Sequence, residues 1–368
     1  MMQTDRERSG CTRRSFLCRA LAASAGAAPP LFGMASSRLG RFGGADRPPN
    51  IVMIISDDQG FGDLGCYGNG IVKTPNLDRL YGQSIRLNQF VVSPLCAPTR
   101  AAVMTGRHNY HVGVWDTYGG RATLRPEVPT LPALLKEAGY RTGFFGKWHL
   151  GTAVPCRPQD RGFEFTCPYG PGKFDSRLRV NGVWQEYTGF YDDALFRVAA
   201  DWIAEQRDAP FFAYIASRLP HDTSRPMAPE PYVAPYRDVP GLAEGDADIY
   251  GMMTKFDENV GMILETLEER GLVDNTVVIY FADNGPLRST PDLTTPYEKS
   301  VCAEYDIRDR YNRGLRAGKT SVYEGGIRVP CFFRWPGVFE AGREIDDLTA
   351  HIDLLPTILD LCGIERPV

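Results

Sequence analysis

The residues with the most evident chemical potential are the cysteine, proline and arginine of the run Pro94–Gly106, PLCAPTRAAVMTG. Pro98 suits the first turn of a helix, because its missing N–H would be unpaired there anyway, and a helix is expected from Pro98 to Met104. Cys96 would then lie at the mouth of that helix, where the helix dipole favours an anion. Taken alone, the same spacing also fits a turn around a buried thiol.

Two pairs of oxygen-bearing side chains follow two apolar runs. Asp57 and Asp58 come directly after Asn50–Ser56, and Asp283 and Asn284 follow Thr276–Phe281. Carboxylate and amide oxygens without a thiol or an imidazole favour Ca²⁺ or Mg²⁺ over zinc. Either pair could instead be a helix N-cap or a turn, because Asp and Asn are common at both.

Lys147 and His149 form a third candidate pair, in the run GKWHL. Two positions apart on extended backbone, they are expected to project to the same side, where they could hold an anionic oxygen and transfer a proton. The alternative is an exposed lysine and a packed histidine. For three further histidines we expect structural roles: His108, His111 and His351.

The elements that must position these residues alternate between strands and helices. Apolar runs of strand length predict strands at Asn50–Ser56, Arg141–Phe145, Phe211–Ala216, Thr276–Phe281 and Val329–Arg334. Helical patterns fall at Leu131–Ala138, Asp192–Arg207, Asp246–Arg270 and Asp353–Cys362. This alternation predicts an α/β fold with a mostly parallel sheet, in which the acidic pairs lie at the carboxyl ends of strands.

Several blocks resemble type I sulfatases. Cys96, Pro98, Arg100, Thr105 and Gly106 match the signature around the nucleophile of that family, and Gly139–Gly151 resembles its second signature. Asp57–Leu80 and Phe281–Gly285 resemble its metal-binding blocks, and Leu219–His221 and the segment around Lys319 resemble two further elements.

The resemblance, to bacterial arylsulfatase-like members of the alkaline phosphatase superfamily, runs from about Asn50 to Ile364. It implies a central, mostly parallel mixed sheet flanked by helices on both faces. Because the sequence stops at Val368, the C-terminal subdomain usual in the family is expected to be largely missing.

The resemblance also implies a mechanism. A separate maturation enzyme would oxidise Cys96 to formylglycine, whose hydrate attacks sulfur. Asp57, Asp58, Asp283 and Asn284, together with the modified Cys96, would bind one divalent cation, usually Ca²⁺ with Mg²⁺ possible. Arg100 would fix the hydrate, Lys147 and Lys319 would hold sulfate oxygens, His221 would protonate the leaving alcohol, and His149 would take the proton of the second hydroxyl.

The function implied is the hydrolysis of sulfate monoesters of aryl or carbohydrate alcohols. One alternative is a phosphate or phosphonate ester hydrolase of the same superfamily, because tetrahedral phosphorus and sulfur esters fit similar sites. The other is a non-catalytic protein that binds sulfated glycans.

The first 45 residues differ from the rest. Thr12-Arg-Arg-Ser-Phe-Leu17, followed by an Ala-rich stretch, resembles a bacterial twin-arginine export signal, and the apolar run is too short to cross a bilayer. We therefore expect a signal and linker at 1–45, a catalytic domain at 46–368, the export machinery as a partner, no transmembrane anchor, and a periplasmic or secreted location.

Composition narrows the possible partners. The 368-residue chain is 43% hydrophobic and 23% charged, which is ordinary for a globular protein. Its net charge is −4, and residues 1–45 carry +5, so the remainder carries −9. This acidic balance gives no reason to expect nucleic acid as a partner, and a sulfated substrate requires local positive charge instead.

Overall fold

The computed structural model of the chain describes residues 47–221, 227–288, 295–308 and 310–365. The expected export signal and linker, residues 1–45, lie outside the described residues, whereas every expected site residue lies within them.

The strands are β1 Asn50–Ser56, β2 Ile85–Val91, β3 Arg141–Gly146, β4 Phe165–Pro168, β5 Arg177–Val180, β6 Val183–Glu186, β7 Phe211–Ala216, β8 Thr276–Ala282, β9 Cys331–Arg334 and β10 Glu344–Ala350. The α-helices are α2 Pro75–Gly82, α3 Cys96–Thr105, α4 Leu131–Glu137, α5 Tyr191–Glu205, α6 Glu230–Arg237, α7 Glu244–Glu269, α8 Pro296–Tyr305, α9 Glu324–Ile327 and α10 Leu354–Leu361. Short 3-10 turns include η3 Asn109–Val112, η4 Gly119–Ala122 and η7 His351–Asp353.

Eight of the described strands form one mixed sheet in the order β10-β2-β9-β8-β1-β7-β3-β4, and β5 and β6 form a separate hairpin. Within the large sheet, β9 runs antiparallel to both β2 and β8, while the other pairs are parallel. The expected mostly parallel mixed sheet is confirmed.

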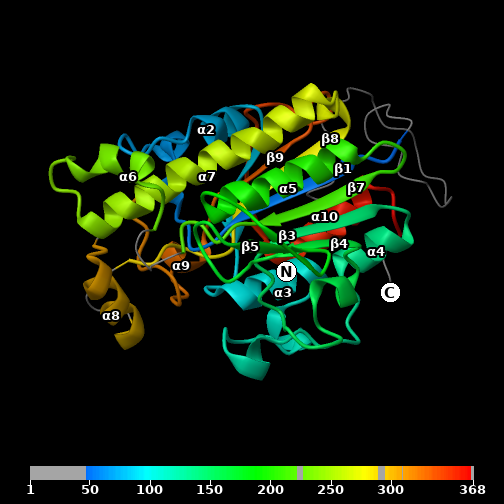
Figure 1. Ribbon diagram of the computed structural model, residues 1–368, viewed down its shortest axis with the longest axis horizontal. Helices are drawn as coiled ribbons and strands as arrows, with labels where there is room; N and C mark the ends of the chain where they lie inside the picture. Colours follow the sequence, from blue (N-terminus) through cyan, green and yellow to red (C-terminus); the bar gives the residue numbers. More distant parts are fainter. Residues whose placement is uncertain (1–46, 222–226, 289–294, 309, 366–368) are drawn as a thin grey trace, which may run out of the picture.

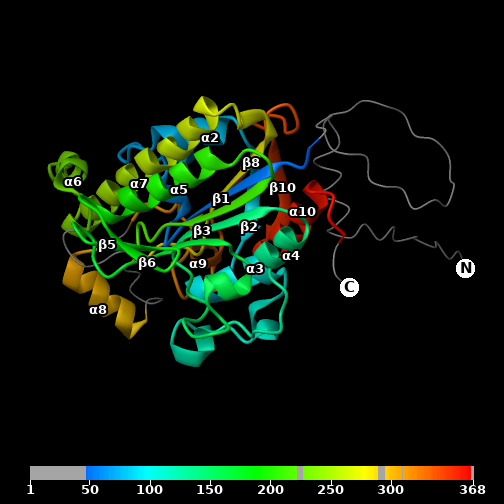
Figure 2. The same cartoon turned by 45° about the vertical axis from the view of Figure 1, so that its right-hand side comes forward.

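Helices cover both faces of this sheet (Figures 1 and 2), with α2, α5 and α7 on one face and α3, α4 and α10 on the other. The central strand β1 shows why two layers are needed. Its side chains alternate between the two cores: Val52 and Ile54 pack under the first layer, and Ile51, Met53 and Ile55 under the second. A strand that is apolar on both sides is stable only when both faces are covered.

The register of the sheet brings the candidate residues to one edge. β1 pairs with β8 so that Ser56 lies opposite Ala282, and the acidic pairs begin one residue later on each strand. On the other side of β1, Ile55 lies opposite Ala216 of β7, which in turn lies opposite Gly146 of β3. The strand ends that precede Asp57, Asp283 and Lys147 therefore lie at nearly the same level.

Some elements are absent from the sequence prediction. β2 and β10 interleave apolar with polar or charged residues, as in IRLNQFV and EIDDLTA, so neither contains a continuous apolar run. β10 is one of the two edge strands of the sheet and leaves several side chains in solvent, which explains its charged composition. The predicted strand Val329–Arg334 is shorter than expected, because β9 begins at Cys331.

The helices of the described residues include none long and apolar enough to cross a membrane.

His351 fixes the segment between β2 and α3, which leads to Cys96. The Val91 carbonyl only accepts hydrogen bonds, so Nδ1 of His351 donates to it at 3.2 Å, and Nε2 accepts from the Ser93 hydroxyl at 3.1 Å. Burial lowers the pKa of His351 to about 4, because the charged ring would lose contact with water. The neutral ring is thus part of the folded structure, as expected from the sequence.

This arrangement predicts acid sensitivity. An unfolded histidine takes up a proton at a pH near 6.5, whereas folded His351 resists it until about pH 4, so stability should fall as the pH drops through this window. The loss from this residue is at most about 3 kcal/mol. His351→Gln should flatten the pH dependence measured by urea unfolding between pH 7 and 4, and the exposed-site variant His111→Gln should not. Equal slopes in the wild type and His351→Gln would contradict this role.

Candidate active site

The two pairs of oxygen-bearing side chains, Asp57 with Asp58 and Asp283 with Asn284, meet in the structure. Asp57, Asp283 and Asn284 are 0% exposed and Asp58 is 2% exposed. The Asn284 amide donates to Oδ1 of Asp58 at 2.7 Å, and the Asp58 backbone N–H donates to Oδ1 of Asp283 at 3.2 Å. Asp58 has a φ of +60°, an uncommon conformation for a residue with a Cβ that recurs at functional sites. The structure thus brings together the four residues expected to hold a cation.

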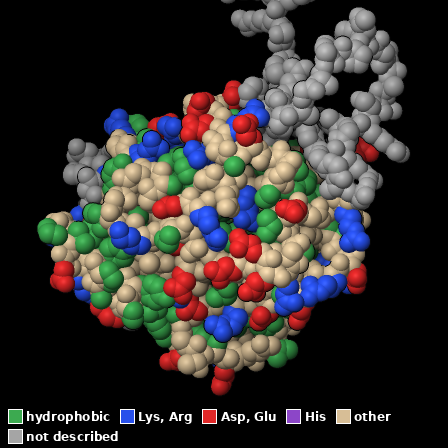
Figure 3. Space-filling model, turned by 90° about the horizontal axis from the view of Figure 1, so that it is seen from above, with side chains coloured by type: hydrophobic (Ala, Val, Ile, Leu, Met, Phe, Trp, Pro, Cys, Tyr) green, Lys and Arg blue, Asp and Glu red, His purple; other side chains and the backbone are tan. Residues whose placement is uncertain are grey.

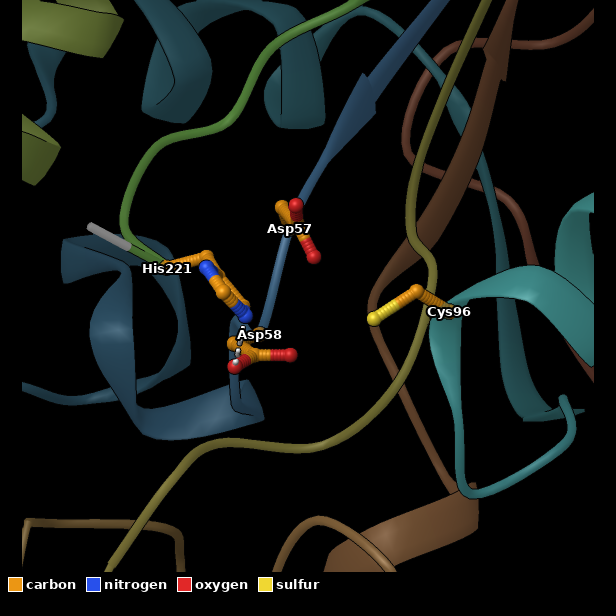
Figure 4. Close-up of side chains that lie close together, drawn as sticks. All are labelled: Asp57, Asp58, Cys96 and His221. Carbon is orange, nitrogen blue, oxygen red and sulfur yellow. Dashed lines mark ion pairs between the residues drawn. The ribbon is translucent and has the colours of Figure 1, made fainter. Parts of the chain in front are cut away.

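Cys96 faces these acids from the other side of the site (Figure 4). It is the first residue of α3, after the N-cap Leu95, so the helix begins two residues before the predicted Pro98. One ligand atom from each of Asp57, Asp58, Cys96 and His221 lies within 4.8 Å of the others. The Cys96 side chain is 1% exposed.

The thiol of Cys96 differs electrostatically from the expectation. Burial raises its pKa to about 12, even though Lys147 and Lys319 oppose the shift. The cost of burying a thiolate therefore outweighs the favourable charges of the two lysines. An unmodified Cys96 is a neutral thiol at neutral pH, which makes it a poor nucleophile.

Three cations balance the three carboxylates. Arg100 of α3 donates to Oδ2 of Asp283 from Nε at 3.0 Å and from Nη2 at 2.8 Å, and its Nη1 donates to the Lys147 carbonyl at 2.8 Å. Lys147, which follows β3, forms an ion pair with Oδ2 of Asp57. Lys319 donates to Oδ2 of Asp58 at 2.6 Å. Each acid thus has its own cation, contributed by a different segment.

These ion pairs determine the protonation of the acids. Burial alone would raise the pKa of Asp57, but Lys147 and the surrounding cations outweigh it and hold the pKa well below its usual range. The pKa of Asp58 is lowered in the same way, chiefly by Lys319 against burial. Burial and the neighbouring Asp57 raise the pKa of Asp283 to about 7, although Arg100 opposes this. Asp57 and Asp58 are therefore the firmly ionised members of the group.

The segment that carries Lys319 packs closely against the one that carries Asn284. The Lys319 N–H donates to the Pro286 carbonyl at 2.9 Å. A Cβ on Gly285 would lie 1.9 Å from the Gly325 carbonyl oxygen, so only glycine allows this approach.

His221 lies beside Asp58 at the candidate active site. Nε2 of His221 is 3.6 Å from Oδ2 of Asp58, next to Cys96, although its side chain is 37% exposed. Loss of contact with water over part of the ring, and then Lys319, lower the pKa of His221, so its ring is neutral at neutral pH. His221 therefore lies inside the cluster, as the resemblance implied.

His149 does not lie as expected. β3 ends at Gly146 and His149 has a φ of +61°, so the prediction that it continues an extended backbone with Lys147 is wrong. Its Nε2 lies 3.0 Å from the Thr117 carbonyl. Because a carbonyl only accepts hydrogen bonds, Nε2 carries the ring proton and donates to it, and Nδ1 is the basic nitrogen. That Nδ1 is buried without a hydrogen-bond partner among the described residues, and burial with Lys147 lowers the pKa of His149 to about 4.

A buried hydrogen-bond network shapes the turn before His221. Oδ1 of Asp192 accepts from the hydroxyls of Ser217 at 2.7 Å and Tyr169 at 3.0 Å. The Ser217 hydroxyl accepts from the Leu219 N–H at 2.9 Å, and the Tyr169 hydroxyl accepts from the Arg218 N–H at 2.6 Å. Sequence reasoning missed these positioning residues and Thr117, because Thr117 acts through a backbone carbonyl and the others belong to no chemical motif.

The donor set fits a hard cation. Oδ1 of Asp57 and Oδ1 of Asn284 are buried and have no hydrogen-bond partner in the described part of the chain. Buried oxygens are rarely left unpaired without a reason, and an oxygen-binding cation is one.

Comparisons with known proteins agree with this geometry. A family model described as Sulfatase matches residues 49–364. N-acetylgalactosamine-6-sulfatase of Homo sapiens is 32% identical over 361 residues, which cover 88% of this chain and 64% of the relative. Arylsulfatase A of Homo sapiens is 31% identical over 366 residues, covering 87% and 65%. The chain thus spans less than two thirds of the length of these curated relatives.

A solved structure gives the same result for the fold. The structure of Ps i-CgsB in complex with k-i-k-neocarrahexaose is 28% identical, has a TM-score of 0.76, and matches over 87% of this chain and 73% of that one. The fold and the site resemble those of type I sulfatases of the alkaline phosphatase superfamily. The chain belongs to the sulfatase family.

The contribution of the buried ion pair between Arg100 and Asp283 to stability can be tested by substitution. Arg100→Gln would leave Asp283, whose pKa already lies near 7, buried without its cation, so the acid would take up a proton. We expect a loss of about 1–3 kcal/mol in the free energy of unfolding, because the hydrogen bonds between Arg100 and Asp283 are lost. Adding Asp283→Asn should restore part of this loss, because it removes the buried carboxyl group that has lost its partner. Urea unfolding without divalent cations would measure both.

Arg141→Gln is the matched control, because Arg141 is 63% exposed and lies 3.6 Å from Glu164. Its loss should stay below about 1 kcal/mol. If Arg100→Gln cost no more than this control, the ion pair would not be what holds Asp283 in place.

Proposed function

We propose that this protein hydrolyses sulfate monoesters. The observation that carries the proposal is the position of Cys96, at the N-terminus of α3, facing the buried Asp57 and Asp58, each of which contacts a lysine ammonium group. A sulfate monoester shields its sulfur with anionic oxygens, so a nucleophile can approach only where those charges are neutralised. Lys147 and Lys319 supply two positive charges at this point.

Asp57, Asp58, Asp283 and Asn284 are proposed to hold one divalent cation, Ca²⁺ or Mg²⁺, together with the modified Cys96. When bound, the ion supplies positive charge that stabilises the charge developing on sulfate oxygens. The unpaired oxygens of Asp57 and Asn284 support this assignment.

Cys96 is proposed to be converted to formylglycine by a maturation enzyme. As its hydrate the aldehyde supplies two hydroxyl groups, one to attack sulfur and one whose later deprotonation expels sulfate. The raised pKa of the buried thiol supports the need for such a conversion, because an unmodified Cys96 is a neutral thiol. Arg100, within hydrogen-bond reach of Asp283 and anchored to the Lys147 carbonyl, is placed to orient the modified side chain.

The two histidines are assigned to proton transfer. His149 is the proposed base, because its Nδ1 is free to accept a proton while Thr117 fixes the tautomer. His221 is the proposed acid for the leaving alcohol. An anionic ester beside it would raise its lowered pKa and so favour the protonated ring it needs.

The substrate is proposed to be a sulfated glycan unit or an aryl sulfate, because relatives are named as sulfatases and a similar structure was solved with an oligosaccharide. Export through the twin-arginine machinery to the periplasm or beyond is part of the same proposal.

A comparison of ester classes tests the reaction type. Protein coexpressed with a maturation enzyme should turn over an aryl sulfate with a higher kcat/KM than the matching aryl phosphate and phosphonate esters. Higher turnover of the phosphorus esters would favour the alternative hydrolase. Binding of sulfated glycans with no turnover of any ester would favour the non-catalytic alternative.

Cys96→Ala should lower kcat for the aryl sulfate by at least about 10³-fold, because it removes the nucleophile. Mass spectrometry of the active wild type should show the aldehyde at position 96. Cys66→Ala is the matched control, since Cys66 is half-buried outside the cluster and should leave kcat unchanged. Full activity in Cys96→Ala would refute the proposed nucleophile.

A further inference from the structure

A hollow of about 570 Å³ lies in the segment that follows α3, and none of its lining residues belongs to the candidate active site. Its walls include Tyr110, Trp115, Leu124 and Arg125, with Gly113 and Gly120 between them. We propose that this hollow binds an anionic sugar residue of an oligosaccharide whose sulfate ester lies at Cys96. The inference rests on the proposed function and extends it to the part of the substrate far from the reacting bond.

The aromatic side chains of this segment are unusually exposed. Tyr110 is 65% exposed and Trp115 is 47% exposed, and Tyr118 next to them is 66% exposed. Grouped exposed aromatic residues mark binding surfaces more often than single ones do. Rings of this kind offer flat apolar faces that pack against the C–H face of a sugar while their polar atoms remain in water.

The charge of the hollow points to an anionic sugar. Arg121 lies over the Trp115 ring at 4.8 Å and forms an ion pair with Asp116 at 3.1 Å, so its charge is already balanced. Arg125 is exposed and has no carboxylate partner among the described residues. Its guanidinium can therefore bind a sulfate or a carboxylate of the ligand, since its fork of donors matches such groups.

The segment is organised before any ligand arrives. The backbone N–H groups of Trp115 and Asp116 donate to the Arg121 carbonyl at 3.0 Å and 3.4 Å. The Asn109 amide donates to the Val114 carbonyl at 2.7 Å, which closes the turn below Trp115. A preformed site loses less entropy on binding than a flexible one.

The same segment is attached to the candidate active site. The Thr117 carbonyl accepts from His149, and the Leu124 N–H donates to the Leu150 carbonyl at 3.1 Å. α3 has ten residues, which places its two ends about 15 Å apart, with Cys96 at one end and η3 beyond the other. A small aryl sulfate at Cys96 would not reach the hollow, but an oligosaccharide would.

This difference in reach gives the experiment. With a sulfated hexasaccharide chosen from heparin-, chondroitin- and carrageenan-derived panels, Trp115→Ala and Arg125→Gln should each raise KM by about tenfold and leave kcat unchanged. With an aryl sulfate, both variants should match the wild type. Trp184→Ala is the control, because Trp184 is 46% exposed and also stacks with an arginine, Arg177, but lies on the β5–β6 hairpin.

Binding should also be measured calorimetrically in a Cys96→Ala background, so that failure of the proposed hydrolysis is distinguishable from failure of this inference. There, Trp115→Ala and Arg125→Gln should weaken hexasaccharide binding about tenfold, whether or not the wild type is active. Unchanged binding in both variants, or no binding by any member of the panel, would overturn the proposal. An equal loss of kcat/KM for the aryl sulfate and the hexasaccharide would also overturn it, because it would indicate a purely structural role.

Discussion

The structure depends on keeping three carboxylates together in a space that water hardly enters. Asp57, Asp58 and Asp283 are at most 2% exposed, and neighbouring carboxylates repel each other strongly when water does not screen their charges. Each acid is therefore matched with one cation, Lys147, Lys319 or Arg100. Removing one partner of such a pair leaves an uncompensated buried charge, so the set acts as a unit.

This constraint explains why so much of the chain is used to build one small site. The acids follow β1 and β8, and their cations come from α3, from the end of β3 and from the segment before α9. Parallel pairing of β8, β1, β7 and β3 brings these segments to one edge, and the helices on both faces bury it. On the proposed function, a divalent ion among the acids would take over part of the neutralising role of the lysines, whose ammonium groups would then be available to sulfate oxygens.

The sequence was most informative where chemistry and strand ends coincide. Apolar runs predicted β1, β3, β7 and β8, and the acids directly after them predicted the cluster, because parallel strands have their carboxyl ends at one edge. β2 and β10 could not be predicted in this way, since their interleaved polar residues carry no continuous apolar signal. The conformation of His149 and its contact with Thr117 could not be predicted from the sequence either. The contact is made by a backbone carbonyl, which every residue type has, so residue identity gives no signal for it. The protonation of Cys96 needed the structure too, because the depth of its burial, which raises the pKa of the thiol against two nearby lysines, cannot be read from the sequence.

The cation site is tested most directly by a crystal structure of the protein grown with Ca²⁺. We predict one ion bonded to Oδ1 of Asp57 and Oδ1 of Asn284, the two buried oxygens of the cluster that lack partners among the described residues, with Asp58 and Asp283 completing the set of ligands. We also predict that the Lys147 and Lys319 ammonium groups move away from the carboxylates they now contact. An ion bound elsewhere, or these four side chains left without an ion at saturating Ca²⁺, would contradict the central claim that the buried acids form a cation site facing Cys96.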